Sequence, residues 1–134
     1  IKNFISFRLA YNKGAAWNIL EGKKFFLVSI SLLASVFVTY MIVRLVDFKN
    51  NLLLSIALIL IDAGSIGNLI DRAFYSEGVI DFLHLEFIDF PTFNVADSCL
   101  TVGAIVLMVY VLFFYKEPDK KNSLNNELGE EENA

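Results

Sequence analysis

Three aspartates stand at or near the ends of long apolar runs in this chain: Asp71, Asp81 and Asp97. A carboxylate at the edge of a bilayer is costly, so its presence there indicates a functional site. If two such carboxylates approach within hydrogen-bonding range, they cannot both ionise, and the pair shares one proton. The ionised member can then take a proton from water while the protonated member donates a hydrogen bond to a carbonyl oxygen. This is general acid–base hydrolysis of a peptide bond.

The helical stripe around Asp71 has a structural interpretation as well. Gly64, Asn68, Asp71 and Arg72 follow one another at spacings of three and four, so they share one face of a helix. Small residues on such a face let another backbone approach, and Asn68 can form a hydrogen bond across the interface. Asp71 and Arg72 are adjacent and cannot face each other, so each needs a partner elsewhere. Helix packing with a surface ion pair therefore stays open beside a catalytic role.

Other polar residues also allow structural explanations. Asp97 opens the last apolar run and is a candidate helix N-cap. Asp62 lies well inside an apolar run, so it is expected to face another helix or to be protonated. A solvated or packed role is favoured for the single histidine, His84. Cys99 is the only cysteine, which excludes an internal disulfide and a Cys/His metal cluster.

The elements that must position these side chains are membrane helices. Hydrophobic residues make up 56% of the 134 residues, far above a soluble domain's usual content. Residues 25–43 carry no charge, 52–70 carry only Asp62, and 98–115 carry none. At about 1.5 Å per residue, each run can cross a hydrocarbon core of roughly 30 Å. We therefore predict an α-helical membrane protein with helices near 25–45, 52–71 and 96–115.

The segments outside these spans form three further parts. Residues 1–11 alternate apolar and polar side chains and predict a strand, followed by a turn that we interpret as a hairpin tip with an interfacial Trp17. Residues 82–93 fit neither the helical nor the strand period of apolar residues and are interpreted as an interfacial flap. After Pro118 the chain is rich in Asn, Lys and Glu and is expected to be disordered. The predicted division is a platform at 1–24, a bundle at 25–116 with a flap at 73–95, and an acidic tail at 117–134.

The charge pattern argues against a nucleic-acid partner, because the net charge is −4 and the sequence has no basic stripe with interleaved aromatic residues. Three spans place residues 1–24 and 71–97 on the same side of the membrane. Six Lys or Arg residues on that side face five on the other, so the positive-inside rule does not orient the bundle.

Four motifs, in this order and interleaved with the spans, resemble bacterial lipoprotein signal peptidase, also called signal peptidase II. They are Asn12-Lys13-Gly14-Ala15-Ala16-Trp17, the Gly-Asn-x-x-Asp-Arg of 67–72, Val79-x-Asp81-Phe82 and Phe93-Asn94-x-Ala96-Asp97. The resemblance covers about residues 1–116. The family has four membrane helices, and the first, which carries an aspartate and a lysine, has no counterpart in this sequence. The resemblance therefore implies a chain truncated at its start, and Asp62 lies outside the family's pattern.

The resemblance implies an aspartyl endopeptidase of the bacterial inner membrane, with a site that faces the extracytoplasmic side. Its substrates would be prolipoproteins, cut just before a cysteine that already carries diacylglycerol. No cofactor or metal is implied, and a monomer that contacts membrane lipid is expected. Carried over by motif, the catalytic pair would be Asp81 and Asp97. The substrate-binding residues would be Asn12, Gly14, Asn68, Arg72 and Asn94, with Asp71 and Gly64 as structural support.

Two other function classes remain as alternatives. A small transport or proton-relay subunit would use Asp62, Asp71, Asp81 and Asp97 as intramembrane proton carriers, and needs carboxylates spaced through the bilayer. Three of these four cluster at one face, which suits cleavage at the membrane surface better. A metal-dependent lipid phosphotransferase would need several carboxylates that converge on one or two cations. Activity that survives a chelator would separate the protease from it.

Overall fold

The computed structural model describes residues 3–15 and 19–115. The predictions for Trp17 and for the acidic tail lie outside the described residues. Along the chain the elements are β1 (Ile5–Asn12), α1 (Lys24–Leu45), α2 (Leu52–Phe74), β2 (Val79–Leu85) and α3 (Val95–Phe113).

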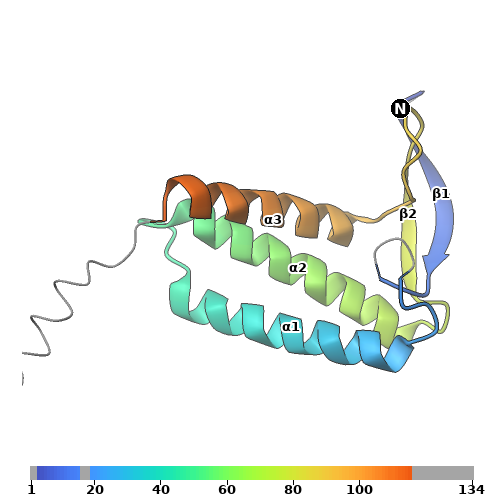
Figure 1. Cartoon of the computed structure of the whole chain (residues 1–134), viewed down its shortest axis with the longest axis horizontal. Helices are drawn as coiled ribbons and strands as arrows, with labels where there is room; N and C mark the ends of the chain where they lie inside the picture. The colour runs from blue at the N-terminus through green and yellow to red at the C-terminus, as the bar shows by residue number, and fades with distance from the viewer. Residues whose placement is uncertain (1–2, 16–18, 116–134) are drawn as a thin grey trace, which may run out of the picture.

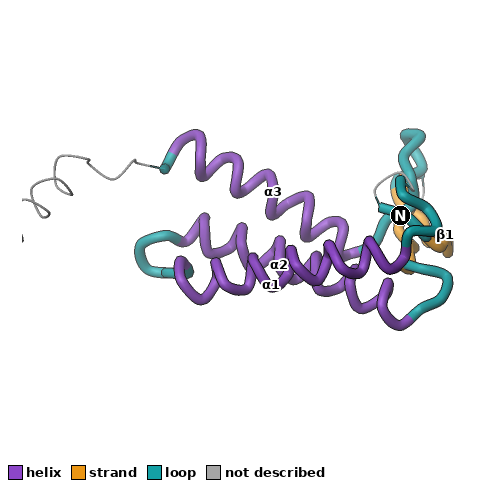
Figure 2. Tube along the Cα trace, turned by 60° about the horizontal axis from the view of Figure 1, so that its bottom comes forward, coloured by secondary structure: helices purple, strands orange, loops and turns teal. Residues whose placement is uncertain are grey.

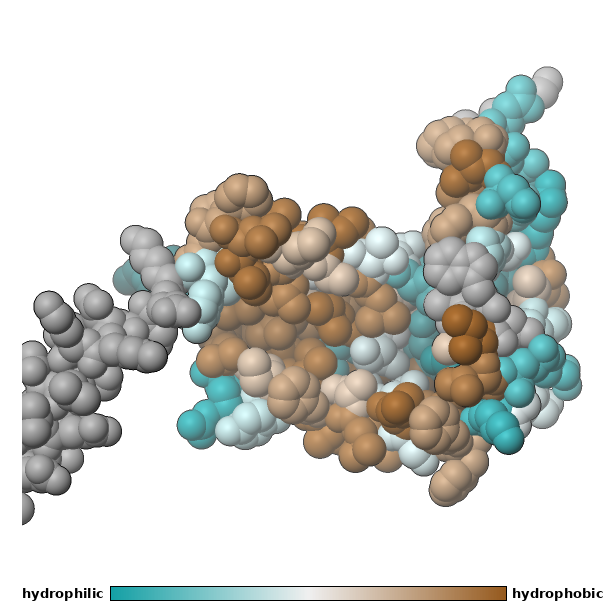
Figure 3. Space-filling view, in the orientation of Figure 1, coloured by the Kyte–Doolittle hydropathy of each residue, from teal (hydrophilic) through white to brown (hydrophobic). Residues whose placement is uncertain are grey.

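The three predicted spans are confirmed as helices that are long and apolar enough to cross a membrane. They contain 22, 23 and 19 residues, so each is about 28–35 Å long. Figure 1 shows them running side by side, with α2 between α1 and α3. Apolar side chains cover their outer surface, while hydrophilic side chains gather at the two ends of the bundle (Figure 3). This distribution is the one that a lipid environment requires.

Helices α2 and α3 pack closely because glycines lie at their interface. A Cβ added at Gly64 would overlap the carbonyl oxygen of Ala96 and the Leu100 side chain. On the opposite helix, a Cβ at Gly103 would come within 2.8 Å of the Ile61 side chain. The predicted small-residue face of α2 is therefore a helix contact, as small residues in membrane helices commonly are.

The platform at the end of the bundle is a two-stranded antiparallel sheet, in which β1 pairs with β2. The predicted N-terminal strand is confirmed, but the hairpin at 12–17 is wrong, because the partner of β1 begins at Val79. Figures 1 and 2 place this sheet at the end of the bundle where α1 begins and α2 ends. The platform therefore combines residues from both the 1–24 and the 73–95 segments.

The expected flap begins with strand β2, which the sequence pattern did not reveal. Its buried positions include Val79 and Asp81, so a carboxylate occupies a place where alternation leads one to expect an apolar side chain. The segment after β2 folds back: Phe93 exchanges backbone hydrogen bonds of 2.8 and 2.9 Å with Leu83. Residues 86–92 have the irregular backbone that the flap interpretation expected.

Candidate functional site

A cavity of about 740 Å³ lies where the bundle meets the platform. Its walls come from all five elements and from the flap. The apolar part includes Ile30, Ala34, Leu100 and Val102, and the flap adds Phe90 and Phe93. The polar part includes Asn12, Asn68, Arg72, Asp81 and Asp97. The structure thus gathers five of the predicted site residues around one space.

Asp81 reaches this cavity from β2 and is almost fully buried, with 3% of its surface exposed. The Asn94 amide nitrogen donates a hydrogen bond of 2.8 Å to its carboxylate. Burial and the nearby Asp97 raise the pKa of Asp81 from 3.8 to about 6, against the opposing effects of Asn94, Asn12 and Arg72. Asp81 therefore takes up a proton much more readily than an ordinary aspartate does.

Asp97 lies in the first turn of α3, and the predicted N-cap role is wrong. The N-cap is Asn94, whose side chain accepts a hydrogen bond of 2.9 Å from the Asp97 backbone N–H. In return, the Asp97 carboxylate accepts a bond of 3.1 Å from the Asn94 backbone N–H. This capping box holds Asp97 at the third helical position, where the helix dipole favours a carboxylate.

Two amides connect the carboxylates. The Asn94 amide nitrogen donates to Asp81 and also, at 3.0 Å, to the Asn68 side-chain oxygen. The Asn68 amide nitrogen then donates to Asp97 at 2.8 Å. Both asparagines are 5% exposed, so this chain of hydrogen bonds is shielded from solvent. It fixes Asp81 and Asp97 relative to each other through side chains from α2 and α3.

Asp71 and Arg72 find partners in different elements, as their adjacency required. The Asp71 carboxylate accepts a hydrogen bond of 3.1 Å from the Ile80 backbone N–H, one residue before Asp81. The Arg72 guanidinium donates to the Gly14 carbonyl at 3.2 Å and to the Asn68 carbonyl at 3.5 Å. Asp71 therefore joins α2 to β2, and Arg72 joins α2 to the loop that follows β1.

The Asn12–Gly14 turn closes on itself. The Asn12 side-chain oxygen accepts a bond of 2.9 Å from the Gly14 N–H, and its amide nitrogen donates to the Ala15 carbonyl at 3.2 Å. Asn12 also lies close enough to Asp81 to lower that carboxyl's pKa through a hydrogen bond. Sequence reasoning missed Gly78, which lies against this turn with a φ of +93°. Its only signal was a glycine directly before Val79.

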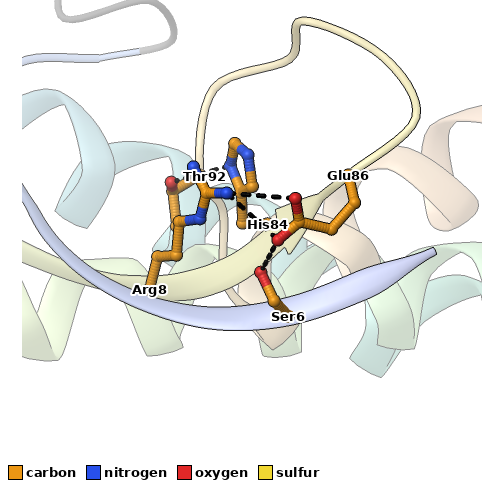
Figure 4. Close-up of polar contacts among 5 residues, drawn as sticks. All are labelled: Ser6, Arg8, His84, Glu86 and Thr92. Carbon is orange, nitrogen blue, oxygen red and sulfur yellow. Dashed lines mark hydrogen bonds and ion pairs between the residues drawn. The ribbon is translucent and has the colours of Figure 1, made fainter. Parts of the chain in front are cut away.

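A second polar cluster lies on the platform, where side chains of β1 and β2 meet those of the segment after β2 (Figure 4). Arg8 forms an ion pair of 3.0 Å with Glu86, and Ser6 also donates to Glu86. The Thr92 hydroxyl contacts the His84 ring at 3.5 Å. His84 is half-buried on the platform. Among the described residues, no group of three or more His, Cys, Asp or Glu side chains could hold a metal ion.

Comparisons with known proteins agree on one family. A family model described as signal peptidase (SPase) II matches residues 1–113. The chain is 39% identical over 126 residues to a lipoprotein signal peptidase of Enterococcus faecalis, covering 93% of this chain and 76% of that protein. It is 42% identical over 112 residues to a protein of the same name from Lactiplantibacillus plantarum, covering 84% and 72%. A solved structure of a bacterial membrane enzyme aligns with a TM-score of 0.75 at 35% identity, covering 89% of this chain and 74% of the other.

Proposed function

We propose that this chain, which belongs to the signal peptidase II family, removes signal peptides from diacylglyceryl-modified prolipoproteins. We further propose that Asp81 and Asp97 direct the cleavage. The family makes the chain a membrane peptidase. The aspartic mechanism, the lipid-modified substrate, the inner membrane and the extracytoplasmic side are parts of the proposal. The observation that carries the mechanism is the pair of carboxylates held at one cavity by the shared amides of Asn68 and Asn94.

The two carboxylates divide the chemistry between them. The raised pKa of Asp81 favours it as the member that holds a proton, and a substrate that displaces water would raise this pKa further. Asp97 then takes a proton from water, and the water oxygen attacks the scissile carbonyl carbon. Asp81 donates its proton toward the carbonyl oxygen, which gives a tetrahedral intermediate. The intermediate collapses when Asp97 returns its proton to the leaving nitrogen and Asp81 recovers its own.

The surrounding residues suit the binding of a peptide that carries a lipid. The apolar wall formed by α1, α3 and the flap can receive the signal helix and acyl chains. Asn12 and Arg72 can hold peptide or ester carbonyls, since an Arg guanidinium offers several donors. The Gly14 carbonyl accepts a hydrogen bond from Arg72, and Asp71 accepts one from the Ile80 N–H next to Asp81, so these two residues have supporting roles. The transport or proton-relay alternative gains little support, because Asp62 is bonded to Thr39 on α1 and does not line the cavity that Asp81 and Asp97 share.

Substitution of the aspartates tests the mechanism. Asp81→Asn and Asp97→Asn are each expected to reduce cleavage of a lipidated prolipoprotein by at least about 10²–10⁴-fold, because an amide keeps the shape but cannot carry the proton. Cleavage is measured in detergent with purified protein, and folding is checked by thermal unfolding. Asp89→Asn is the matched control, since it makes the same change at an exposed flap position outside the cavity wall.

Normal turnover by either dyad variant would contradict the dyad. A loss of activity in a chelator that added metal restores would favour the metal-dependent alternative instead.

A further inference from the structure

Two buried polar atoms lie without a partner at the interface of α1 and α2. They are the Ser35 hydroxyl oxygen and Oδ1 of Asp62. Ser35 is 5% exposed and Asp62 is 8% exposed, so bulk solvent does not satisfy them. Buried polar side chains in proteins nearly always have a hydrogen-bond partner, either from the protein or from an ordered water. These two atoms therefore require an explanation.

The contact between Thr39 and Asp62 places Ser35 and Asp62 near each other along the α1–α2 interface. The Thr39 hydroxyl donates a hydrogen bond of 3.0 Å to Oδ2 of Asp62, which places Asp62 against α1. Ser35 precedes Thr39 by four residues, so it lies on the same face of α1, one turn away. The unpartnered hydroxyl is thus one helical turn from the contact that anchors the carboxyl group. Figures 1 and 2 show α1 and α2 side by side along this stretch.

The site lies about one helical turn from side chains that line the cavity. Ser31, one turn before Ser35 on α1, lines that cavity, and so does Ser65, three residues after Asp62 on α2. Hydroxyl groups therefore continue along the α1–α2 interface from the cavity toward the middle of the bundle.

We propose that Ser35 and Asp62 together bind one internal water molecule. A polar site of this kind, with at least two partners and shielded from solvent, is where proteins hold ordered water. The water would donate to Oδ1 of Asp62 and accept from the Ser35 hydroxyl, so that both unpartnered atoms are satisfied. A side chain of another protein does not fit, because both residues are more than nine-tenths buried within the helix pair. This inference is independent of the proposed peptidase mechanism.

A crystal structure of the whole chain in a lipid mesophase, at a resolution that shows ordered waters, tests the site directly. We expect one water at hydrogen-bonding distance from both Ser35 Oγ and Asp62 Oδ1, about 2.5–3.0 Å from each. A dry gap would overturn the proposal, as would a direct hydrogen bond between the two side chains. This measurement needs no variant and does not depend on activity.

A double-mutant cycle tests the same site in solution. Ser35→Ala is expected to lower the unfolding temperature of the parent protein by roughly 2–8 °C, because Oδ1 of Asp62 loses its bridged partner. In an Asp62→Leu background the same change should have little effect, since the water has already lost its second anchor. Equal effects in both backgrounds would overturn the proposal.

Ser55→Ala is the matched control for this cycle. Ser55 is also buried on α2, but its hydroxyl already donates to the Asn51 carbonyl at 2.9 Å and accepts from the Asp47 N–H at 3.0 Å. Its effect on the unfolding temperature should be the same with and without Asp62→Leu. Unfolding is also compared in sodium and in choline buffers. An unfolding temperature that rises in sodium only, and only while Asp62 is present, would mean a bound cation and would overturn the assignment to water.

Discussion

The surroundings of Asp81 destabilise its ionised form, although the proposed reaction uses this residue to transfer a proton. The fold encloses its carboxylate beside a second carboxylate and provides only the Asn94 and Asn12 amides and a nearby arginine in return. The folded protein therefore prefers the protonated form, while the unfolded chain ionises near pH 3.8. At neutral pH the ionised form is held at a cost in folding free energy, which is a common property of groups prepared for proton transfer.

This conflict predicts a pH dependence of stability. Because the folded protein binds the Asp81 proton more tightly, the contribution of that proton to stability is complete below about pH 3.8 and is lost as pH rises through about 6. Asp81→Asn removes the ionisation. Its free energy of unfolding should exceed that of the parent by about 1–3 kcal/mol at pH 8 and should match it near pH 3. Unfolding in detergent at both pH values measures the difference.

The comparison between variant and parent isolates Asp81 from other titrating groups. Hydrogen bonds lower the pKa values of Asp47, Glu77 and Glu86, so these residues contribute stability that is lost on acidification in both proteins. In an Asp97→Asn background, the stability that Asp81→Asn gains at pH 8 should be smaller, because Asp97 helps to raise the pKa of Asp81. An Asp81→Asn protein that gains no stability at pH 8 would show that burial does not disfavour the ionised carboxyl.

At the scale of elements, the contacts that join the end of α2 to β1 and β2, here called the joint, fix the position of Asp81. Asp71 on α2 holds the Ile80 N–H, and an ion pair of 2.8 Å between Lys13 and Glu77 closes the same joint from the side. Gly78 lets the start of β2 pass against Asn12: a Cβ there would overlap the Asn12 carbonyl oxygen. Small changes in this joint should therefore affect the proposed active site through Asn12 and Asp81.

Two glycines with similar backbones test this joint. Gly78 has a φ of +93° and Gly22 a φ of +78°, so alanine is strained at both, at a cost of about 1–2 kcal/mol. Only Gly78→Ala adds the overlap with Asn12, since nothing lies within 4 Å of a Cβ at Gly22. We expect both variants to be less stable than the parent protein. We also expect the remaining folded Gly78→Ala protein to cleave substrate more slowly than the folded parent protein does.

The readout for the glycine pair is kcat per folded molecule, measured on a lipidated prolipoprotein. A smaller kcat for Gly78→Ala than for Gly22→Ala supports a positioning role of the joint. Equal kcat values for the two folded variants would restrict Gly78 to a structural role.

At the scale of the whole molecule, an apolar bundle carries a platform across one end, and the cavity lies between them. A peptide bond reaches such a site only if the substrate presents it at that depth. A diacylglyceryl group on the residue after the cut can do so, because its buried methylenes contribute about 0.8 kcal/mol each. The architecture thus suits a substrate that arrives laterally, with its lipid and its signal helix both in the membrane.

Substrate selection should follow from this geometry. A lipidated precursor is expected to be cut far faster than the same peptide with an unmodified cysteine, and the difference should appear in kcat as well as in KM, because remote binding positions the bond. Initial rates on the two substrates in one detergent provide the measurement. Equal rates on the lipidated and the unmodified substrate would mean that the site does not recognise the lipid.

The sequence by itself determined the features that depend on local physics. Length without charge predicted the three spans, since crossing a bilayer imposes the same demand on every helix. Alternation predicted β1, and spacing on one helix face predicted that Asn68 can bond across a helix interface, as it does to Asp97 of α3. The family motifs singled out the residues that the cavity gathers.

Only the tertiary structure decided how those parts meet. The pairing of β1 with β2 joins segments that two helices separate, so nothing local reveals it. Asn94 rather than Asp97 caps α3, and Asp71 bonds the Ile80 backbone, because a polar group takes the partner that the fold brings within reach. Strand β2 escaped detection for the same reason. Its buried face carries Asp81, and residues from β1, α2 and the start of α3 offset only part of the cost of a carboxyl group there.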